Sequence, residues 1–110
     1  MVMLSDIKRL AADIARRFDP DKIVLFGSHA SGAQGETSDV DLLIVMDFQG
    51  PAVDQSSAIW SALRPAFPVD LIVRTPAEVA RRYAQFDPLI REAIDKGQVL
   101  HERDRARVAG

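Results

Sequence analysis

The stretch "FGSHASGAQGETSDVDLLIV", residues 26–45, places a polar loop between two apolar runs. Gly27 and Ser28 follow the first run, whereas Asp39 and Asp41 open the second run. Carboxylates are rarely buried without partners, so a cation or a set of hydrogen-bond donors must compensate their charge. The group that compensates Asp39 and Asp41 decides what this chain does.

Composition excludes several classes of protein. A length of 110 residues, 47% of them hydrophobic and 27% charged, predicts one globular domain over residues 1–110. The net charge of −2 gives no basic surface and argues against direct nucleic-acid binding. The chain has no cysteine, which excludes disulfides and thiol nucleophiles. It has neither a membrane-length apolar run nor a signal-peptide pattern, so we expect a cytoplasmic protein.

The hydrophobic pattern predicts helices and strands in alternation. Helices are expected at 5–18, 52–64, 75–86 and 87–96, with one helical turn after Ser28, and strands at 22–27, 40–46, 69–74 and 98–102. This order predicts a small mixed sheet of three to four strands flanked by helices, in the α/β or α+β class. The charged segment 102–110 is expected to be a frayed tail.

Three patterns predict where helices begin or end. Ser5 is expected to cap the first helix. Thr75, followed by Pro76 and Glu78, has the spacing of a capping box. Gly97 is expected to end the last helix before the strand at 98–102. The apolar residues around that last helix either pack on the sheet, which we favour, or form a partner surface; they are Tyr83, Phe86, Leu89, Ile90 and Ile94.

Three aspartates open two of the predicted strands. Side chains alternate along a strand, so Asp39 and Asp41 point the same way, roughly 6–7 Å apart. Asp70 opens the strand "VDLIVR", and the three carboxylates converge if the two strands are neighbours in register. Three such anions raise each other's pKa unless a cation neutralises them. Ligation by oxygen alone favours Mg²⁺ or Mn²⁺.

The Gly27-Ser28 pair adds features of a phosphate site. Gly27 lets another group approach the backbone closely, and Ser28 supplies a hydroxyl beside free amides. The loop is not a P-loop, because Ala33 and Gln34 stand where Lys and Ser or Thr are required. A phosphate site beside a divalent cation is typical of phosphoryl or nucleotidyl transfer. Taken singly, each aspartate would instead be an ordinary turn former.

The motif resembles that of the minimal nucleotidyltransferases of the DNA polymerase β superfamily. Their signature is Gly-Ser, ten residues and Asp-x-Asp, which Gly27-Ser28 and Asp39-Val40-Asp41 match, and Asp70 matches the third carboxylate. The resemblance implies the polymerase-β-type fold and a two-metal, Mg²⁺-dependent transfer of AMP from ATP. It also implies that Asp39 and Asp41 hold the metals and that Gly27 and Ser28 contact the triphosphate. Asp70 would complete the metal site and could serve as the base.

The resemblance also suggests an acceptor. In similar bacterial and archaeal systems the minimal nucleotidyltransferase is an antitoxin that attaches AMP to a tyrosine of a HEPN-domain toxin, and we expect such a partner here. One departure stands against activity, because Ser31 occupies the position where many relatives carry Arg. An antitoxin that neutralises its partner by contact alone therefore stays open, as does transfer to a small molecule such as an antibiotic.

Overall fold

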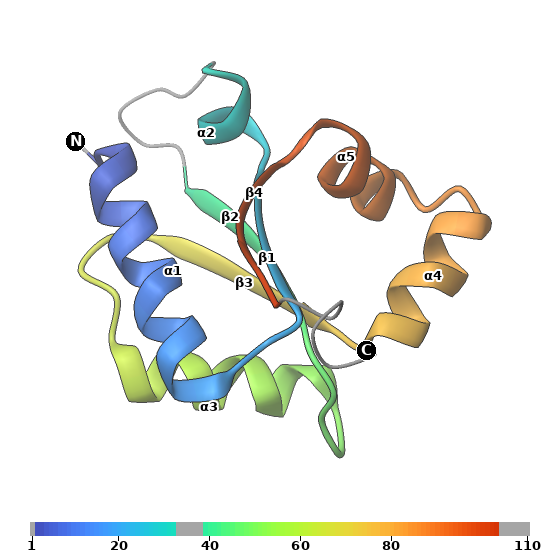
Figure 1. The fold of residues 1–110 in the computed structure, drawn as a ribbon, viewed down its shortest axis with the longest axis horizontal. Helices are drawn as coiled ribbons and strands as arrows, with labels where there is room; N and C mark the ends of the chain where they lie inside the picture. The colour runs from blue at the N-terminus through green and yellow to red at the C-terminus, as the bar shows by residue number, and fades with distance from the viewer. Residues whose placement is uncertain (1, 33–38, 104–110) are drawn as a thin grey trace.

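The computed structural model describes residues 2–32 and 39–103. Five helices and four strands follow one another in this part of the chain (Figure 1). Their order is α1 (Leu4–Phe18), β1 (Lys22–Phe26), α2 (Ser28–Ser31), β2 (Val40–Val45), α3 (Ala52–Leu63), β3 (Val69–Arg74), α4 (Pro76–Ala84), α5 (Pro88–Lys96) and β4 (Gln98–Glu102). The predicted α+β class and the expected strands are confirmed. No described helix is both long and apolar enough to cross a membrane.

The four strands form one mixed sheet in the order β3-β2-β1-β4. β1 runs antiparallel to both β2 and β4, whereas β2 and β3 are parallel. β2 therefore lies inside the sheet, as its apolar sequence predicts. The end of β1 and the starts of β2, β3 and β4 consequently meet at the same end of the sheet.

Helices cover both faces of the sheet (Figure 1). Alternate strand residues pack against α1 and α3 in one core cluster, and the intervening residues pack against α4 and α5 in a second cluster. The second cluster contains Val24, Phe26, Leu43, Val45, Ile90 and Ala93, with Ile72, Val79 and Tyr83 partly buried against it. Beyond Asp41, both faces of β2 are therefore apolar and buried. Asp41 itself is only partly buried.

The first helix begins earlier than its sequence predicts. Met3 is the N-cap of α1, so Ser5 lies inside the first turn and the predicted Ser5 cap is wrong. Asp6 replaces it in function, because its Oδ2 accepts a hydrogen bond of 3.0 Å from the Met3 N–H. An acidic side chain in the first turn satisfies a free amide and complements the helix dipole.

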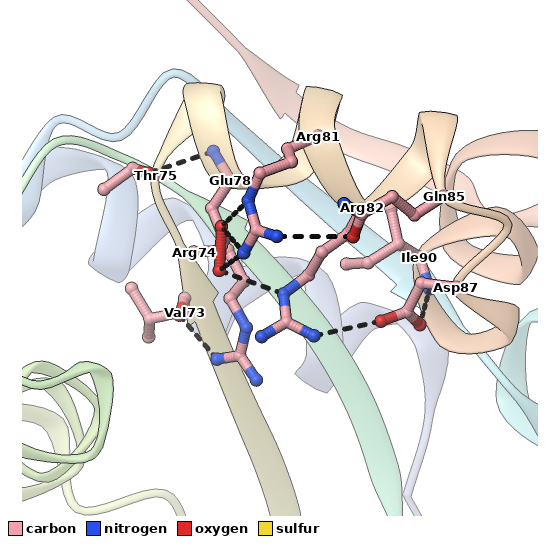
Figure 2. Close-up of polar contacts among 9 residues, drawn as sticks. All are labelled: Val73, Arg74, Thr75, Glu78, Arg81, Arg82, Gln85, Asp87 and Ile90. Carbon is pink, nitrogen blue, oxygen red and sulfur yellow. Dashed lines mark hydrogen bonds and ion pairs between the residues drawn. The ribbon is translucent and has the colours of Figure 1, made fainter.

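The start of α4 confirms half of the predicted capping box. Thr75 Oγ1 accepts a hydrogen bond of 3.2 Å from the Glu78 N–H, with Pro76 in the first turn. The Glu78 carboxylate does not reach back to the cap; it pairs with Arg81 and Arg82 instead (Figure 2). Two guanidiniums one turn further along the helix offer charge-assisted hydrogen bonds, which are stronger than the bond to a neutral amide.

The corner between α4 and α5 is held by polar and aromatic contacts. Asp87 caps α5 by accepting from the N–H groups of Leu89 and Ile90, and it also pairs with Arg82 at 3.1 Å (Figure 2). The Arg91 guanidinium lies 3.7 Å from the centre of the Tyr83 ring and also covers Phe86. Of the apolar residues around these helices, Ile90 is buried whereas Phe86 remains 74% exposed. The favoured packing on the sheet therefore holds for only part of the set.

The end of the described chain is more ordered than the predicted tail. Glu102 closes β4, and the Arg103 N–H donates to the Asp21 carbonyl at 2.8 Å. The Arg103 guanidinium pairs with Asp19 at 2.7 Å and with Asp21 at 3.3 Å. Residues 102 and 103 of the predicted frayed segment are therefore anchored, and residues 104–110 lie outside the described part.

Gly97 ends α5 for a different reason from the one its sequence suggests. Its backbone is extended, with φ −76° and ψ 170°, so the left-handed conformation does not require glycine here. A Cβ at this position would overlap the Ala93 carbonyl oxygen and the Val24 side chain. The close approach of α5 to β1 requires the missing side chain.

Gly97→Ala should therefore lower the free energy of unfolding by roughly 2–3 kcal/mol, because backbone atoms of α5 must move. Gly50→Ala is the matched control, since a Cβ there meets open space and only the positive φ of 82° opposes it, at a cost of about 1 kcal/mol. Urea denaturation measures both. An equal or smaller loss for Gly97→Ala would contradict the packing argument.

Candidate active site

The sheet register places two of the predicted aspartates side by side. Asp41 of β2 pairs with Asp70 of β3 in the parallel ladder and with Phe26 of β1 on its other side. β2 and β3 are thus neighbours in register, which is the condition that the sequence left open. Asp39 lies just before β2 and is exposed. All three residues therefore lie at the end of the sheet where β1 stops and β2 and β3 start.

The same end of the sheet faces α5. Asp41 has the strand parity of Leu43, and Asp70 has the parity of Ile72, and both of these apolar residues pack in the cluster with α5. Further along, the face is filled by apolar side chains under α4 and α5. The carboxylates thus stand where the apolar packing under α5 gives way to solvent, since Asp41 is partly buried and Asp70 is exposed.

Gly27 is shaped around the Asp41 carboxylate. The Gly27 backbone has φ 77° and ψ −154°, which L side chains rarely adopt. A Cβ at this position would overlap Asp41 Oδ2. The close approach that the sequence predicts at Gly27 is therefore observed, and the group that approaches is the carboxylate of Asp41.

Asp41 lies in an unfavourable electrostatic environment. Burial raises the pKa of its carboxyl above the ordinary value of 3.8, and the charges of Asp70, Asp39 and Glu92 raise it further. His29 opposes this rise in pKa. Four carboxylates thus act on the same region of space, with too little nearby positive charge to offset them. A group that supplies positive charge there would relieve this repulsion.

The donor chemistry of this end of the sheet fits a hard divalent cation. Asp39, Asp41 and Asp70 offer carboxylate oxygens only, which Mg²⁺ prefers over nitrogen or sulfur ligands. Their mutual repulsion at Asp41 is the observation that favours a bound cation. Within residues 2–32 and 39–103, however, no three acidic or histidine side chains are already gathered as a metal-ligand group. The three-ligand set therefore stays a prediction.

Ser28 opens α2, a single turn that lies against the end of β1 and the start of β2 (Figure 1). The Gly27 carbonyl accepts hydrogen bonds of 3.2 Å from the N–H groups of Ala30 and Ser31, so the expected turn after Ser28 is confirmed. Ser31 Oγ donates to the Ser28 carbonyl at 3.2 Å. Ser31 therefore stabilises the turn and brings no charge to it.

A pocket of about 400 Å³ lies beside this turn. Gly27, Ser28 and Ser31 line it from one side, and Glu92 and Lys96 of α5 line it from the other. The sequence did not single out Glu92 or Lys96, because polar residues on an amphipathic helix are by default solvent-exposed. Their spacing of four in "REAIDK" places both on one helix face, but only the docking of α5 shows which face that is.

A larger pocket, of about 780 Å³, lies at the opposite end of the sheet. Lys22 and Val45 line it, and these two residues pair at the far end of the β1–β2 ladder from Phe26 and Asp41. None of the predicted site residues contributes to it. The chemistry therefore favours the smaller pocket. Gly27 lines this pocket and lies against the Asp41 carboxylate, although Asp39, Asp41 and Asp70 do not line it themselves.

The sequence matches the family described as "Nucleotidyltransferase domain" over residues 7–101. No curated protein matches the chain significantly. The match to the nucleotidyltransferase family runs from most of α1 to nearly all of β4 and includes all five predicted site residues.

Solved structures share the fold at low sequence identity. A Sulfolobus solfataricus protein assigned as a nucleotidyltransferase superimposes with a TM-score of 0.65 and 22% identity, covering 94% of this chain and 83% of that one. A toxin–antitoxin complex with AMP-PNP superimposes with a TM-score of 0.59 and 20% identity, covering 93% of this chain and 78% of the matched one. A complex of a tri-AMPylated Shewanella oneidensis HEPN toxin with MNT antitoxin superimposes with a TM-score of 0.55 and 17% identity, covering 97% of this chain and 79% of the matched one.

The electrostatic environment of Asp41 makes a prediction about stability. The folded chain holds the Asp41 proton more tightly than the unfolded chain, because the folded-state pKa is raised. The Asp41 contribution to stability is therefore lost as pH rises from about 3.8 through the folded-state value. Asp41→Asn removes this loss, so at pH 7 in EDTA we expect its Tm to exceed that of the wild type by roughly 2–5 °C.

Thermal unfolding at pH 7 and at pH 4 measures this difference, which should shrink at the lower pH. Added Mg²⁺ should raise the Tm of the wild type and leave that of Asp41→Asn nearly unchanged. Asp54→Asn, in the exposed first turn of α3, is the matched control and should show no gain. A lower Tm for Asp41→Asn in EDTA would show that its carboxylate stabilises the fold instead.

Proposed function

The chain belongs to the nucleotidyltransferase domain family, and on this basis we propose that it transfers AMP from ATP to a hydroxyl group of a partner HEPN-domain toxin, acting as its antitoxin. The observation that carries the proposal is the pairing of Asp41 with Asp70 beside the Gly27-Ser28 turn. This arrangement offers carboxylates for a cation next to a pocket open to phosphate. We expect the reaction in the cytoplasm.

Each predicted site residue has a role in this proposal. Asp39 and Asp41 would hold Mg²⁺, and Asp70 would complete the set of carboxylate ligands. When bound, the cation supplies Lewis-acid stabilisation of the phosphate oxygens. Gly27 leaves room at the end of β1 for the Asp41 carboxylate, and Ser28 offers a hydroxyl to the triphosphate.

The transfer itself is an in-line displacement at phosphorus. The acceptor hydroxyl oxygen attacks the α-phosphorus of ATP, the bond from that phosphorus to the bridging oxygen breaks, and pyrophosphate leaves. Asp70 would take the proton of the acceptor hydroxyl. It suits this role because it is exposed at the end of the sheet, where an acceptor can approach from solvent.

The structural neighbours support a protein acceptor. The Shewanella oneidensis complex contains a HEPN toxin that carries three AMP groups, and another toxin–antitoxin complex contains AMP-PNP. One chain of each complex shares the fold of this chain. A tyrosine of the partner is the acceptor that we propose.

The test is intact-mass analysis of the HEPN-domain product of a neighbouring gene after incubation with this protein, ATP and Mg²⁺. We expect AMP-sized mass increments with the wild type and at least a hundredfold slower modification with the double variant Asp39→Asn, Asp41→Asn. The matched control Asp13→Asn, Asp54→Asn removes two aspartates from α1 and α3, away from the site, and should modify the partner at the wild-type rate.

A second candidate is an antitoxin that works by binding alone. It is favoured by the uncharged Ser31 in the pocket and by the lack of a gathered three-ligand group among the described residues. The same double variant separates the two functions. A binding antitoxin would neutralise its partner with both aspartates replaced and would leave no mass increment, whereas an enzyme would lose its protection.

A further inference from the structure

The pocket beside the Gly27-Ser28 turn has a charged wall that the sequence did not reveal. On the turn side, its lining residues Gly27, Ser28 and Ser31 carry no charge. On the helix side, Glu92 and Lys96 stand one turn apart on α5. Among the described residues that line this pocket, Lys96 is the only one with a cationic side chain.

The position of Lys96 is fixed by the packing of α5. Ile90 and Ala93 are 1% exposed and lie in the core cluster with Val24 and Phe26 of β1. Gly97 then lets the end of α5 approach β1 more closely than any side chain would allow. Because Lys96 directly precedes Gly97, its backbone is held against β1, the strand that ends at Phe26 just before Gly27.

The charge of Lys96 is available for a ligand. Within residues 2–32 and 39–103, Lys96 takes part in no ion pair, although Glu92 stands at the spacing where such pairs form. The nearby carboxylates make this end of the sheet strongly acidic. A nucleoside triphosphate, itself a polyanion, needs positive charge from the protein in addition to a cation held by aspartates.

We propose that Lys96 binds the terminal phosphates of the nucleotide substrate and supplies positive charge to a pocket whose turn-side lining residues carry none. This inference rests on the proposed function, since it concerns the same nucleotide. Lysine binds phosphate as a compact point charge on a flexible stem, and the pocket of about 400 Å³ gives that stem room to move. Lys96 is then a specificity residue that distinguishes triphosphates from monophosphates.

A simpler role must be separated from this one. Lys96 stands in the last turn of α5, where a positive charge stabilises a helix through its dipole. That role concerns stability and not nucleotide choice. It predicts the same loss of Tm for Lys96→Ala with or without nucleotide, and no difference between a triphosphate and a monophosphate.

The experiment is isothermal titration of the full chain with AMP-PNP and, separately, with AMP, both in Mg²⁺. We expect Lys96→Ala to weaken AMP-PNP binding about tenfold or more and AMP binding less than threefold. Lys96→Arg should keep most of the affinity, because the charge remains. Lys8→Ala, an exposed lysine on α1, is the matched control and should bind both nucleotides as the wild type does.

A rescue variant tests the location of the charge. Position 31 lines the same pocket, so Ser31→Arg in the Lys96→Ala background should restore at least part of the AMP-PNP affinity. If the wild type binds AMP-PNP and Lys96→Ala binds it equally well, Lys96 is not a phosphate ligand and this inference alone is overturned. If the wild type binds no AMP-PNP, the proposed function falls together with it.

Discussion

The parallel pairing of β2 with β3 is the constraint on which the site depends. It places Asp41 opposite Asp70 at an end of the sheet where the core packing stops. Asp39 lies two residues before Asp41 at the same end. A shift of one residue would turn one of the two carboxylates toward the core under α1 and α3. The alternation of apolar residues on both strands opposes such a shift, because Leu42 and Leu71 are buried on that side. The core therefore holds the register that the site needs.

This arrangement has an electrostatic cost that the fold does not remove. Burial and neighbouring carboxylates raise the pKa of Asp41, and the backbone of Gly27 is held in a conformation that accommodates the Asp41 side chain. Local strain and repulsion of this kind are commonly found at functional sites, where a ligand relieves them. A bound cation would relieve the repulsion at Asp41. The acidic site and the apolar core thus share the strand β2, with the change between them at Asp41.

The helix α5 connects this site to the second face of the sheet. Its apolar side packs on β1, its last residue precedes a glycine that permits close approach, and its polar side lines the pocket at Gly27. The corner with α4 is fixed by the stacking of Arg91 on Tyr83 and by the Tyr83 hydroxyl, which donates to Asp95 at 2.7 Å. The helix that completes this core cluster is therefore also the helix that places the charged side chains of Glu92 and Lys96 at the pocket beside Gly27.

The sequence by itself determined the strands, the mixed sheet and the motif of Gly27, Ser28, Asp39, Asp41 and Asp70, because hydrophobic periodicity and turn residues act locally. It was wrong where local alternatives compete, as at Ser5: Met3 is the N-cap instead, and the Asp6 side chain accepts from the Met3 N–H. Only the tertiary structure decided that Asp41 meets Asp70, that Asp41 requires glycine at position 27, and that Lys96 faces the pocket. These contacts join residues far apart in the chain, and their geometry is set by register and helix docking, which no local pattern encodes.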